Sequence, residues 1–250
     1  MKLKIMSCFL LMLAFVCVDY TQTVKITPKK TVYQRKPDKG FEHKKTFTIT
    51  YPKISGLTAA LNKKIEKSVS YESVFDFTLN EEINELFWLE EAGYKIDYNN
   101  RGILSIALSI DGSGAYPSGS TKHIVVNLKN GNQINAADAF TKLPELARFA
   151  DKSLQSRIKK AIAERRKESA EDAETLRERL TEAKFGAENL ELFSVNQKGV
   201  TFYYDYGFPH VILALEPDNQ FFFSYNQLKS FIKTSGSLKQ FVRENEKSRE

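Results

Sequence analysis

The sequence predicts an α+β fold: one compact module with a mainly antiparallel sheet and helices packed on one face of it. Segments with the alternation typical of strands and segments with helical spacing come in separate blocks, which is the order found in α+β proteins. The chain of 250 residues is 42% hydrophobic and 12% aromatic. It therefore has enough apolar side chains for a substantial core, and disorder along the whole chain is not expected.

The folded part is expected to begin with a strand over residues 47–51, where apolar and polar side chains alternate until Pro52 ends it. A helix follows, because apolar residues recur every four positions from Leu57 to Val69. Helical spacing then continues, with breaks, toward Trp88. This block of helices precedes a run of strands.

An antiparallel meander is predicted in the middle of the chain. Residues 94–98 and 103–110 flank the turn Asn99-Asn100-Arg101-Gly102, and residues 123–128 form the next strand. Between the second and third of these strands lies the stretch "DGSGAYPSGS", residues 111–120, which consists of small and turn-forming residues around one tyrosine. We interpret it as a loop that connects the strands and contacts a ligand or partner.

The second half of the chain begins with helices. Pro144 is well placed for the first turn of an amphipathic helix that extends to Ile162, and Ser169 is a candidate cap for a second helix carrying Leu176 and Leu180. The mixed charges of residues 164–179 are typical of a solvated helix face.

Strands return near the C-terminus, and a short helix closes the module. The strands are predicted at residues 192–195, 200–204 and 221–225, and the helix at residues 227–232. The module spans residues 46–235 and is divisible into subdomains 46–140 and 141–235, followed by a polar tail, 236–250.

The N-terminus has the features of an export signal. Lys2 and Lys4 precede the uncharged apolar run from Ile5 to Val18, which at about 14 residues is shorter than a spanning helix. We therefore expect an extracytoplasmic protein that is secreted, periplasmic or N-terminally anchored, with cleavage, lipidation and retention of residues 1–18 all open. Both cysteines, Cys8 and Cys17, lie in this run, so a cleaved chain has no thiol for disulfides, catalysis or metal binding.

Residues 19–45 are interpreted as a basic linker. Residues 24–45 hold eight basic and two acidic side chains, and Pro28, Pro37 and the Lys39-Gly40 step are typical of a linker. We expect such a segment to act as a solvated tether, or in an exported protein to contact anionic lipid headgroups or wall polymers rather than nucleic acid. The residues expected to make this contact are Lys29, Lys30, Arg35 and Lys36.

No known catalytic or metal motif is present. Adjacent acids, as in Glu81-Glu82 and Glu90-Glu91, point away from each other and are poor glycosidase pairs. The serines of residues 111–120 lack a nucleophile elbow, and the glycines there lack the Gly-Lys-Ser/Thr end of a phosphate loop. The three histidines are too far apart for a local metal motif, so no metal or cofactor is expected: His43, His123 and His210.

Four stretches of the sequence resemble an extracytoplasmic domain pair of unknown function. That family is found in anti-sigma factors of the lysozyme-sensing type and N-terminal to some peptidoglycan deacetylases. The stretch "FTITYPKISGLTAALNKKI" resembles its opening, and "GILSIALSIDGSGAYPSGSTKHIVVNLKNGNQI" its central block. "GVTFYYDYGF" and "FFFSYNQLKSFI" are similar to its closing block, so the match covers roughly residues 46–232.

The resemblance implies a non-catalytic sensing or binding module outside the membrane, with a cell-wall polymer or an envelope protein as its partner. The family often has Gly-Gly-Ala-His-Pro in the central loop. Here Tyr116 stands in place of the histidine, so no metal or acid–base role is expected for that loop. An envelope-polymer hydrolase with an unrecognised active site and an anti-sigma-like or inhibitory partner stay open as alternatives. The expected ligand contacts, chosen as aromatic and glycine positions of two exposed loops, are Gly112, Gly114, Tyr116, Pro117, Tyr204, Tyr206 and His210.

Overall fold

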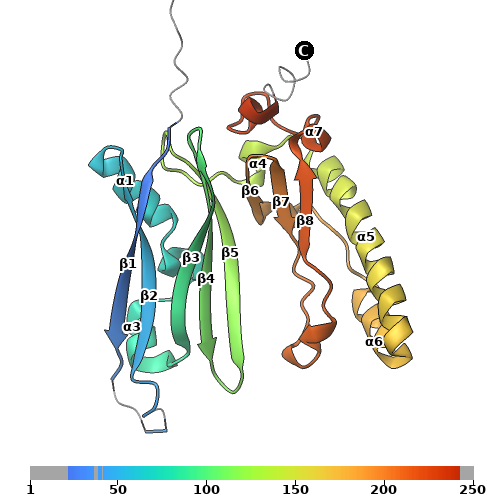
Figure 1. Cartoon of the computed structure of the whole chain (residues 1–250), viewed down its shortest axis with the longest axis horizontal. Helices are drawn as coiled ribbons and strands as arrows, with labels where there is room; N and C mark the ends of the chain where they lie inside the picture. Colours follow the sequence, from blue (N-terminus) through green and yellow to red (C-terminus); the bar gives the residue numbers. More distant parts are fainter. Residues whose placement is uncertain (1–21, 37–38, 41, 243–250) are drawn as a thin grey trace, which may run out of the picture.

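The computed structural model of this protein describes residues 22–36, 39–40 and 42–242, so the predicted signal segment lies outside the described residues. The first half of the chain forms a five-stranded sheet with short helices (Figure 1). Its strands are β1 (Lys25–Gln34), β2 (Thr46–Ser55), β3 (Leu89–Asn100), β4 (Ile103–Ser113) and β5 (Pro117–Asn127). Its helices are α1 (Ala59–Ser68), α2 (Tyr71–Phe75), α3 (Leu79–Glu81) and the π-helix η1 (Glu82–Leu86).

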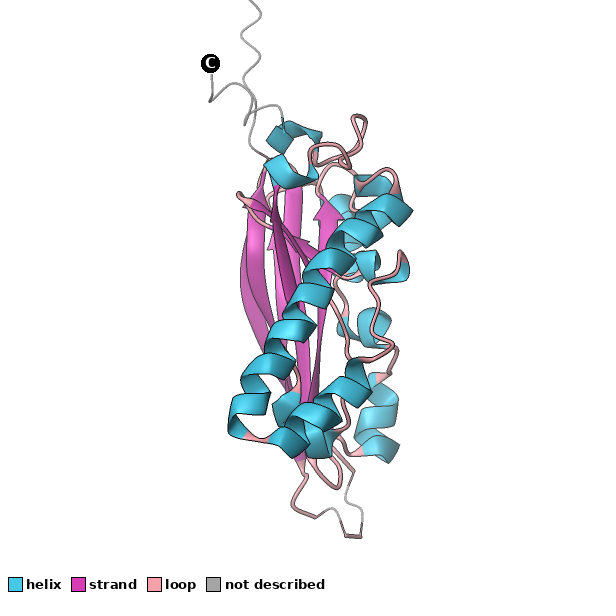
Figure 2. Cartoon of the chain, turned by 90° about the vertical axis from the view of Figure 1, so that its right-hand side faces the viewer, coloured by secondary structure: helices cyan, strands magenta, loops and turns pink. Residues whose placement is uncertain are grey.

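The second half forms a three-stranded sheet with longer helices, and Figure 2 shows the longest helix crossing the strands at an angle. Its helices are α4 (Ala136–Ala139), α5 (Leu143–Glu168), α6 (Ala170–Leu180), η2 (Glu188–Glu191), η3 (His210–Leu215) and α7 (Tyr225–Leu228). Its strands are β6 (Phe193–Val195), β7 (Gly199–Tyr203) and β8 (Gln220–Ser224). The predicted α+β class and the single compact module are confirmed, with two sheets in place of one.

Both sheets keep their strands in sequence order, and among the described strands only β2 and β3 pair in parallel. The β3–β4 connection is a two-residue turn in which Arg101 and Gly102 both have positive φ, as a tight hairpin requires. The β4–β5 hairpin is longer than predicted. Its pairing extends to Ser113 and Pro117, so only residues 114–116 of the expected loop are unpaired.

Helix boundaries follow the capping residues of the sequence. Ser169 caps α6 by accepting from the Asp172 N–H, and Pro144 lies in the first turn of α5, both as predicted. The closing helix is shorter and earlier than predicted. It begins at Tyr225 because Ser224 and Gln227 form a reciprocal capping box there.

Two apolar cores lie on opposite faces of the five-stranded sheet. One core is between this sheet and the α1–α2 region, and it includes Leu104, Ile106 and Leu108 of β4. The other core belongs to the second half and reaches back to Ile103 of β4 and Val125 of β5. Because side chains alternate along a strand, β4 contributes to both cores.

The predicted linker is wrong for Lys25–Gln34, which form β1 and pair with β2 along its whole length. The strand β2 continues through Pro52, contrary to the prediction, and Pro52 lies opposite Pro28 of β1. Neither proline can donate, so this pair occupies a non-hydrogen-bonded position of the ladder, where the N–H groups would point away from the partner strand. The lysines of β1 lie on the edge of the sheet, where exposed charge opposes pairing with another chain.

Arg35 attaches the end of β1 to the rest of the first half. Its guanidinium is buried and donates to the carbonyl oxygens of Thr46, Glu82 and Leu89 and to the Glu82 carboxylate, 3.3 Å away. The same carboxylate accepts from the Leu89 N–H at 3.0 Å. The sequence-based view of Arg35 as a membrane contact is therefore wrong, because the group is enclosed by its partners.

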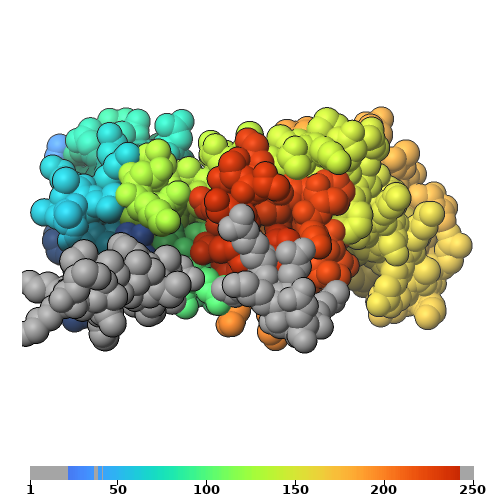
Figure 3. Space-filling view, turned by 90° about the horizontal axis from the view of Figure 1, so that it is seen from above, coloured from blue at the N-terminus to red at the C-terminus, as the bar shows by residue number. Residues whose placement is uncertain are grey.

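The C-terminal segment, predicted as a polar tail, packs in part into the core. Leu238 is fully buried and Phe241 stacks on Tyr225, with ring centroids 4.4 Å apart. From above, the red residues that follow β8 lie between the two halves of the molecule (Figure 3). The described part of the predicted tail, residues 236–242, therefore belongs to the folded module.

We expect Arg35→Met to lower the free energy of unfolding by about 3–5 kcal/mol, because it leaves the Glu82 carboxylate buried without its cation. Denaturant unfolding followed by circular dichroism measures this loss. Lys36→Met removes a neighbouring, exposed cation and is the control, with an expected change within about 0.5 kcal/mol. Equal effects of the two substitutions would contradict the structural role of Arg35.

Leu238→Ala should destabilise the protein by about 2–5 kcal/mol, the usual range for removing a fully buried leucine side chain. Val211→Ala removes a side chain that is 86% exposed and should change stability by no more than about 0.5 kcal/mol. If the two variants unfold at the same denaturant concentration, the C-terminal segment is not part of the core.

Candidate functional site

A polar cleft of about 610 Å³ lies between the two sheets. The five-stranded sheet contributes Asp97, Ser109, Thr121 and His123 to one wall, among others. Opposite them lie Tyr203 of β7, Gln220 of β8 and Asn219, which precedes β8. Most side chains of the cleft carry hydrogen-bonding groups, so its chemistry differs from that of both cores.

The cleft begins where the contact between the two halves ends. In that contact the Ser105 hydroxyl of β4 accepts a hydrogen bond from the Val195 N–H of β6 at 3.1 Å, and Ser105 is fully buried. Ala107 and Ser109 follow on the same face of β4, and their partners on β5 are His123 and Thr121. The second half covers this part of the face only in part, where Tyr203 stacks on His123, and most of the residues here are polar.

The His123 ring is held by one partner on each side of the cleft. It stacks on Tyr203 with ring centroids 3.6 Å apart and an interplanar angle of 9°. Its Nδ1 lies 3.6 Å from Asp97 Oδ2, a distance that suits an ion pair when the imidazole is protonated but is too long for a hydrogen bond. Both atoms are buried and have no hydrogen-bond partner within the described part of the chain.

Asp97 owes its position to an irregularity in β3. The register of β3 on β4 shifts between Ile96 and Tyr98, and a bulge of this kind redirects the side chain of the extra residue. The Lys95 ammonium lies 3.8 Å from Asp97 Oδ1, but it is largely exposed and therefore screened by solvent. Polar atoms that are buried without partners cost free energy, so Asp97 and His123 favour a ligand or solvent that bonds to them.

The Tyr203 hydroxyl lies beside the Ser194 hydroxyl, with 3.0 Å between the two oxygens. Burial raises the pKa of Tyr203 above its ordinary value, and the nearby Asp97 carboxylate acts in the same direction. Tyr203 is therefore a neutral phenol under ordinary conditions. It can stack and hydrogen-bond in the cleft, but it does not supply a phenolate.

The structure brings together the two segments that the sequence analysis singled out. Tyr116, at the tip of the β4–β5 hairpin, stacks on His210, the first residue of η3, with ring centroids 5.4 Å apart. Both residues are exposed, Tyr116 to 67%, and their neighbours Gly114 and Pro117 are exposed as well. This contact lies in the β4–β5 hairpin and the β7–β8 connection, the segments that also border the cleft.

Three of the predicted contact residues, Gly112, Tyr204 and Tyr206, are buried. The sequence-based prediction places them on exposed loops. Gly112 packs against the backbone of Trp88, where no side chain fits. The Tyr204 hydroxyl accepts from the Lys184 N–H at 3.1 Å, and the Tyr206 hydroxyl donates to the Asp218 carbonyl at 3.3 Å. Both tyrosines belong to the core of the second half, and burial raises the pKa of each.

The cleft residues Asp97, His123 and Tyr203 were not singled out from the sequence. The available signal was weak: Ser109 interrupts the apolar run of β4, and Thr121 and His123 share one face of β5. The bulge that directs Asp97 arises when β3 pairs with β4, and the stacking partner of His123 arises only when the two halves meet. The described residues contain no cluster of three or more side chains able to hold a metal ion.

A second cavity, of about 330 Å³, lies on the helical side of the five-stranded sheet. It is mainly apolar, with Phe75, Phe77 and Trp88 in its walls. The charged residue at its edge is Glu82, whose carboxylate is already bound by Arg35 and by the Leu89 N–H. This cavity lacks the convergent polar groups of the cleft, so the cleft is the better candidate site.

No known protein-family profile matches the sequence, and neither does any curated protein. Solved structures do resemble it. A DUF3298 family protein from Pseudomonas aeruginosa PAO1 is 14% identical, with a TM-score of 0.57 over 85% of this chain and 95% of that chain. A member of the same family from Bacteroides fragilis NCTC 9343 is also 14% identical, with a TM-score of 0.47 over 86% and 94% of the two chains. At this identity the first likeness shows the fold alone, which is that of a domain of unknown function, as the sequence resemblance implied.

Proposed function

We propose that this protein is an exported, non-catalytic module that binds a saccharide strand of the cell envelope in the cleft between its two sheets. The single observation behind the proposal is the polar lining of that cleft, above all the buried, unpartnered atoms of Asp97 and His123. A ligand rich in hydroxyl groups can donate to the carboxylate and bond to the imidazole at the same time.

The rest of the cleft suits the same chemistry. Asn219 and Gln220 carry amides, which donate and accept, and Ser109 and Thr121 carry hydroxyl groups. Ligand sites for apolar molecules are mainly hydrophobic, whereas this site offers hydrogen bonds from both walls. The stacked rings of Tyr116 and His210 add an exposed aromatic surface that a sugar ring or an envelope protein can contact.

A hydrolase acting on an envelope polymer is the second candidate. The observation that favours it is the approach of Asp97 to His123, an arrangement in which a carboxylate can orient an imidazole. The two candidates differ in one measurement, because a hydrolase releases new reducing ends from the polymer and a binding module does not.

The extracytoplasmic location rests on residues 1–18 of the sequence. In the part of the chain that the structure describes, no helix has both the length and the apolar character needed to cross a membrane. The context suggested by the family resemblance, beside an anti-sigma factor or a deacetylase, stays part of the proposal. Of the predicted membrane contacts, Lys29, Lys30 and Lys36 are exposed and remain candidates.

Thr121→Arg should abolish retention of the protein on purified peptidoglycan, because the larger side chain projects into the cleft from an exposed strand position. Ser120→Arg is the matched control: the neighbouring residue on the same strand points to the other face of the sheet and should leave retention unchanged. Cosedimentation with the polymer measures both variants.

Asp97→Asn adds a test of the chemistry. Loss of a hydrogen bond to a charged group should weaken binding by about tenfold or more without changing the shape of the cleft. Unchanged affinity in both Asp97→Asn and Thr121→Arg would show that the cleft is not the binding site. Release of reducing ends by the parent protein would favour the hydrolase instead.

Tyr116→Ala should reduce retention on peptidoglycan or on envelope proteins captured in a pull-down, because it removes the most exposed aromatic surface next to the cleft. Ile96→Ala, an exposed apolar residue on the other face of β3, is the control. If Tyr116→Ala is retained as well as the parent, the hairpin tip takes no part in binding.

A further inference from the structure

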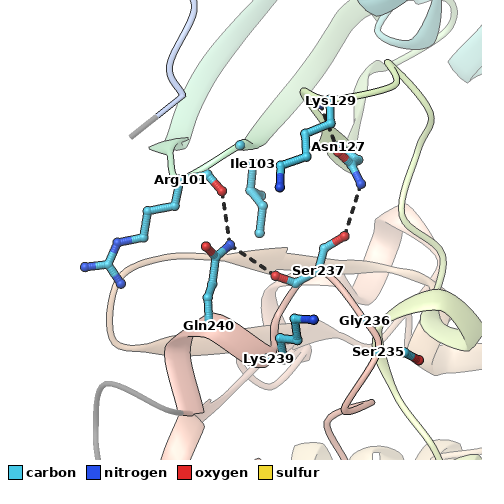
Figure 4. Close-up of a pocket in the computed structure, with 10 residues that line it drawn as sticks. Arg101, Ile103, Asn127, Lys129, Ser235, Gly236, Ser237, Lys239 and Gln240 are labelled. Atoms are coloured by element: carbon cyan, nitrogen blue, oxygen red, sulfur yellow. Dashed lines mark hydrogen bonds between the residues drawn. The ribbon is translucent and has the colours of Figure 1, made fainter. Parts of the chain in front are cut away.

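We infer that this protein binds a phosphate group in a third pocket, at the end of the molecule where its two halves meet. The pocket has a volume of about 250 Å³ and is formed by the β3–β4 turn, the end of β5 and the C-terminal segment (Figure 4). It is separate from the cleft, so the inference stands apart from the proposed function.

Hydrogen bonds across the two halves hold the pocket in shape. The Gln240 side-chain amide donates to the carbonyl oxygens of Arg101, at 3.0 Å, and Ser237, at 3.1 Å. The Asn127 amide donates to the Ser237 hydroxyl oxygen at 3.2 Å. The bonds to the Arg101 carbonyl and from the Asn127 amide, drawn as dashed lines in Figure 4, connect the first sheet to the C-terminal segment, and the bond to the Ser237 carbonyl lies within that segment.

The charge of the pocket is positive. Lys129 comes from the first half and Lys239 from the second, and neither forms an ion pair with any residue that the structure describes. No lining residue is acidic, and the Arg101 guanidinium points away from the two lysines and lies 5.7 Å from the centre of the Phe241 ring (Figure 4). Cations that share a pocket repel each other, so an anion between them would be favoured by both.

The donor groups fit phosphate oxygens. The Ser237 hydroxyl accepts from Asn127, which leaves its own hydrogen available to donate into the pocket. Ser235 supplies a second hydroxyl, and the two ammonium groups supply charge-assisted donors. The volume exceeds that of a bare phosphate ion, so the class of ligand is a phosphate mono- or diester with part of its substituent enclosed.

The position of the pocket allows two sources of that group. Gln22 lies at the same end, since its carbonyl accepts from the Gly102 N–H at 2.8 Å and its amide donates to the Leu128 carbonyl at 3.1 Å. If the N-terminus is an anchor, this end faces lipid headgroups. A phosphate-containing polymer of the envelope carries the same chemistry.

Isothermal titration of the full chain with glycerol phosphate, at ionic strength held constant with chloride, tests the inference. We expect saturable binding that Lys129→Met and Lys239→Met each weaken by about tenfold or more. Lys63→Met removes an exposed lysine of α1 and should leave binding unchanged. Lys129→Arg keeps the charge and should retain most of the affinity, which separates loss of charge from loss of fold.

Absence of saturable binding, or an equal effect of all three lysine-to-methionine variants, overturns the inference. Two further arms identify the source of the phosphate group. Competition by poly(glycerol phosphate) indicates a polymer, and Lys129-dependent binding to phosphatidylglycerol vesicles, but not to phosphatidylcholine vesicles, indicates a membrane. If the protein binds glycerol phosphate but neither the polymer nor the vesicles, the ligand is a soluble phosphate ester.

Discussion

The structure depends on one strand, β4, that is buried on both faces at its beginning. Leu104 and Ile106 face the core under the short helices, and Ile103 and Ser105 face the second half of the chain. The bond from the Val195 N–H to the Ser105 hydroxyl connects the two sheets at this point. A strand with two buried faces needs an almost continuous apolar sequence, and residues 103–108 have it, with one serine whose hydroxyl is satisfied.

The cleft is a consequence of how far that contact extends. Beyond Ser105 the two sheets separate around the cleft and meet again where Tyr203 stacks on His123. This part of the face carries Ser109, Thr121 and His123 in place of apolar residues. The stacking of His123 on Tyr203 and the meeting of Tyr116 with His210 then fix the distance between the two walls. The likeness to a DUF3298 protein extends over 85% of this chain, so the two chains share their fold. The residues that line the cleft in this chain, and not the shared fold, support the proposed function.

Charge has different roles at two places in the molecule. Arg35 and Glu82 are buried and satisfied by backbone groups, so they determine where β1 and the π-helix lie. Lys129 and Lys239 are exposed at a pocket without acidic neighbours, and they have no described ion pair. The first pair stabilises the fold, whereas the second pair offers binding energy to an anion.

The sequence by itself determined the fold class, the hairpin around Gly102, the Ser169 cap of α6 and the position of the Tyr116 segment, because alternation, helical spacing and turn residues are local signals. It did not reveal that residues 25–34 of the basic segment form a strand, because Pro28 and three lysines outweigh the weak alternation there until β2 supplies the partner. Only the tertiary structure decided which polar residues share a cleft. Asp97, His123 and Tyr203 belong to three different strands, and their proximity arises from a bulge and from the contact between two sheets, neither of which leaves a local pattern.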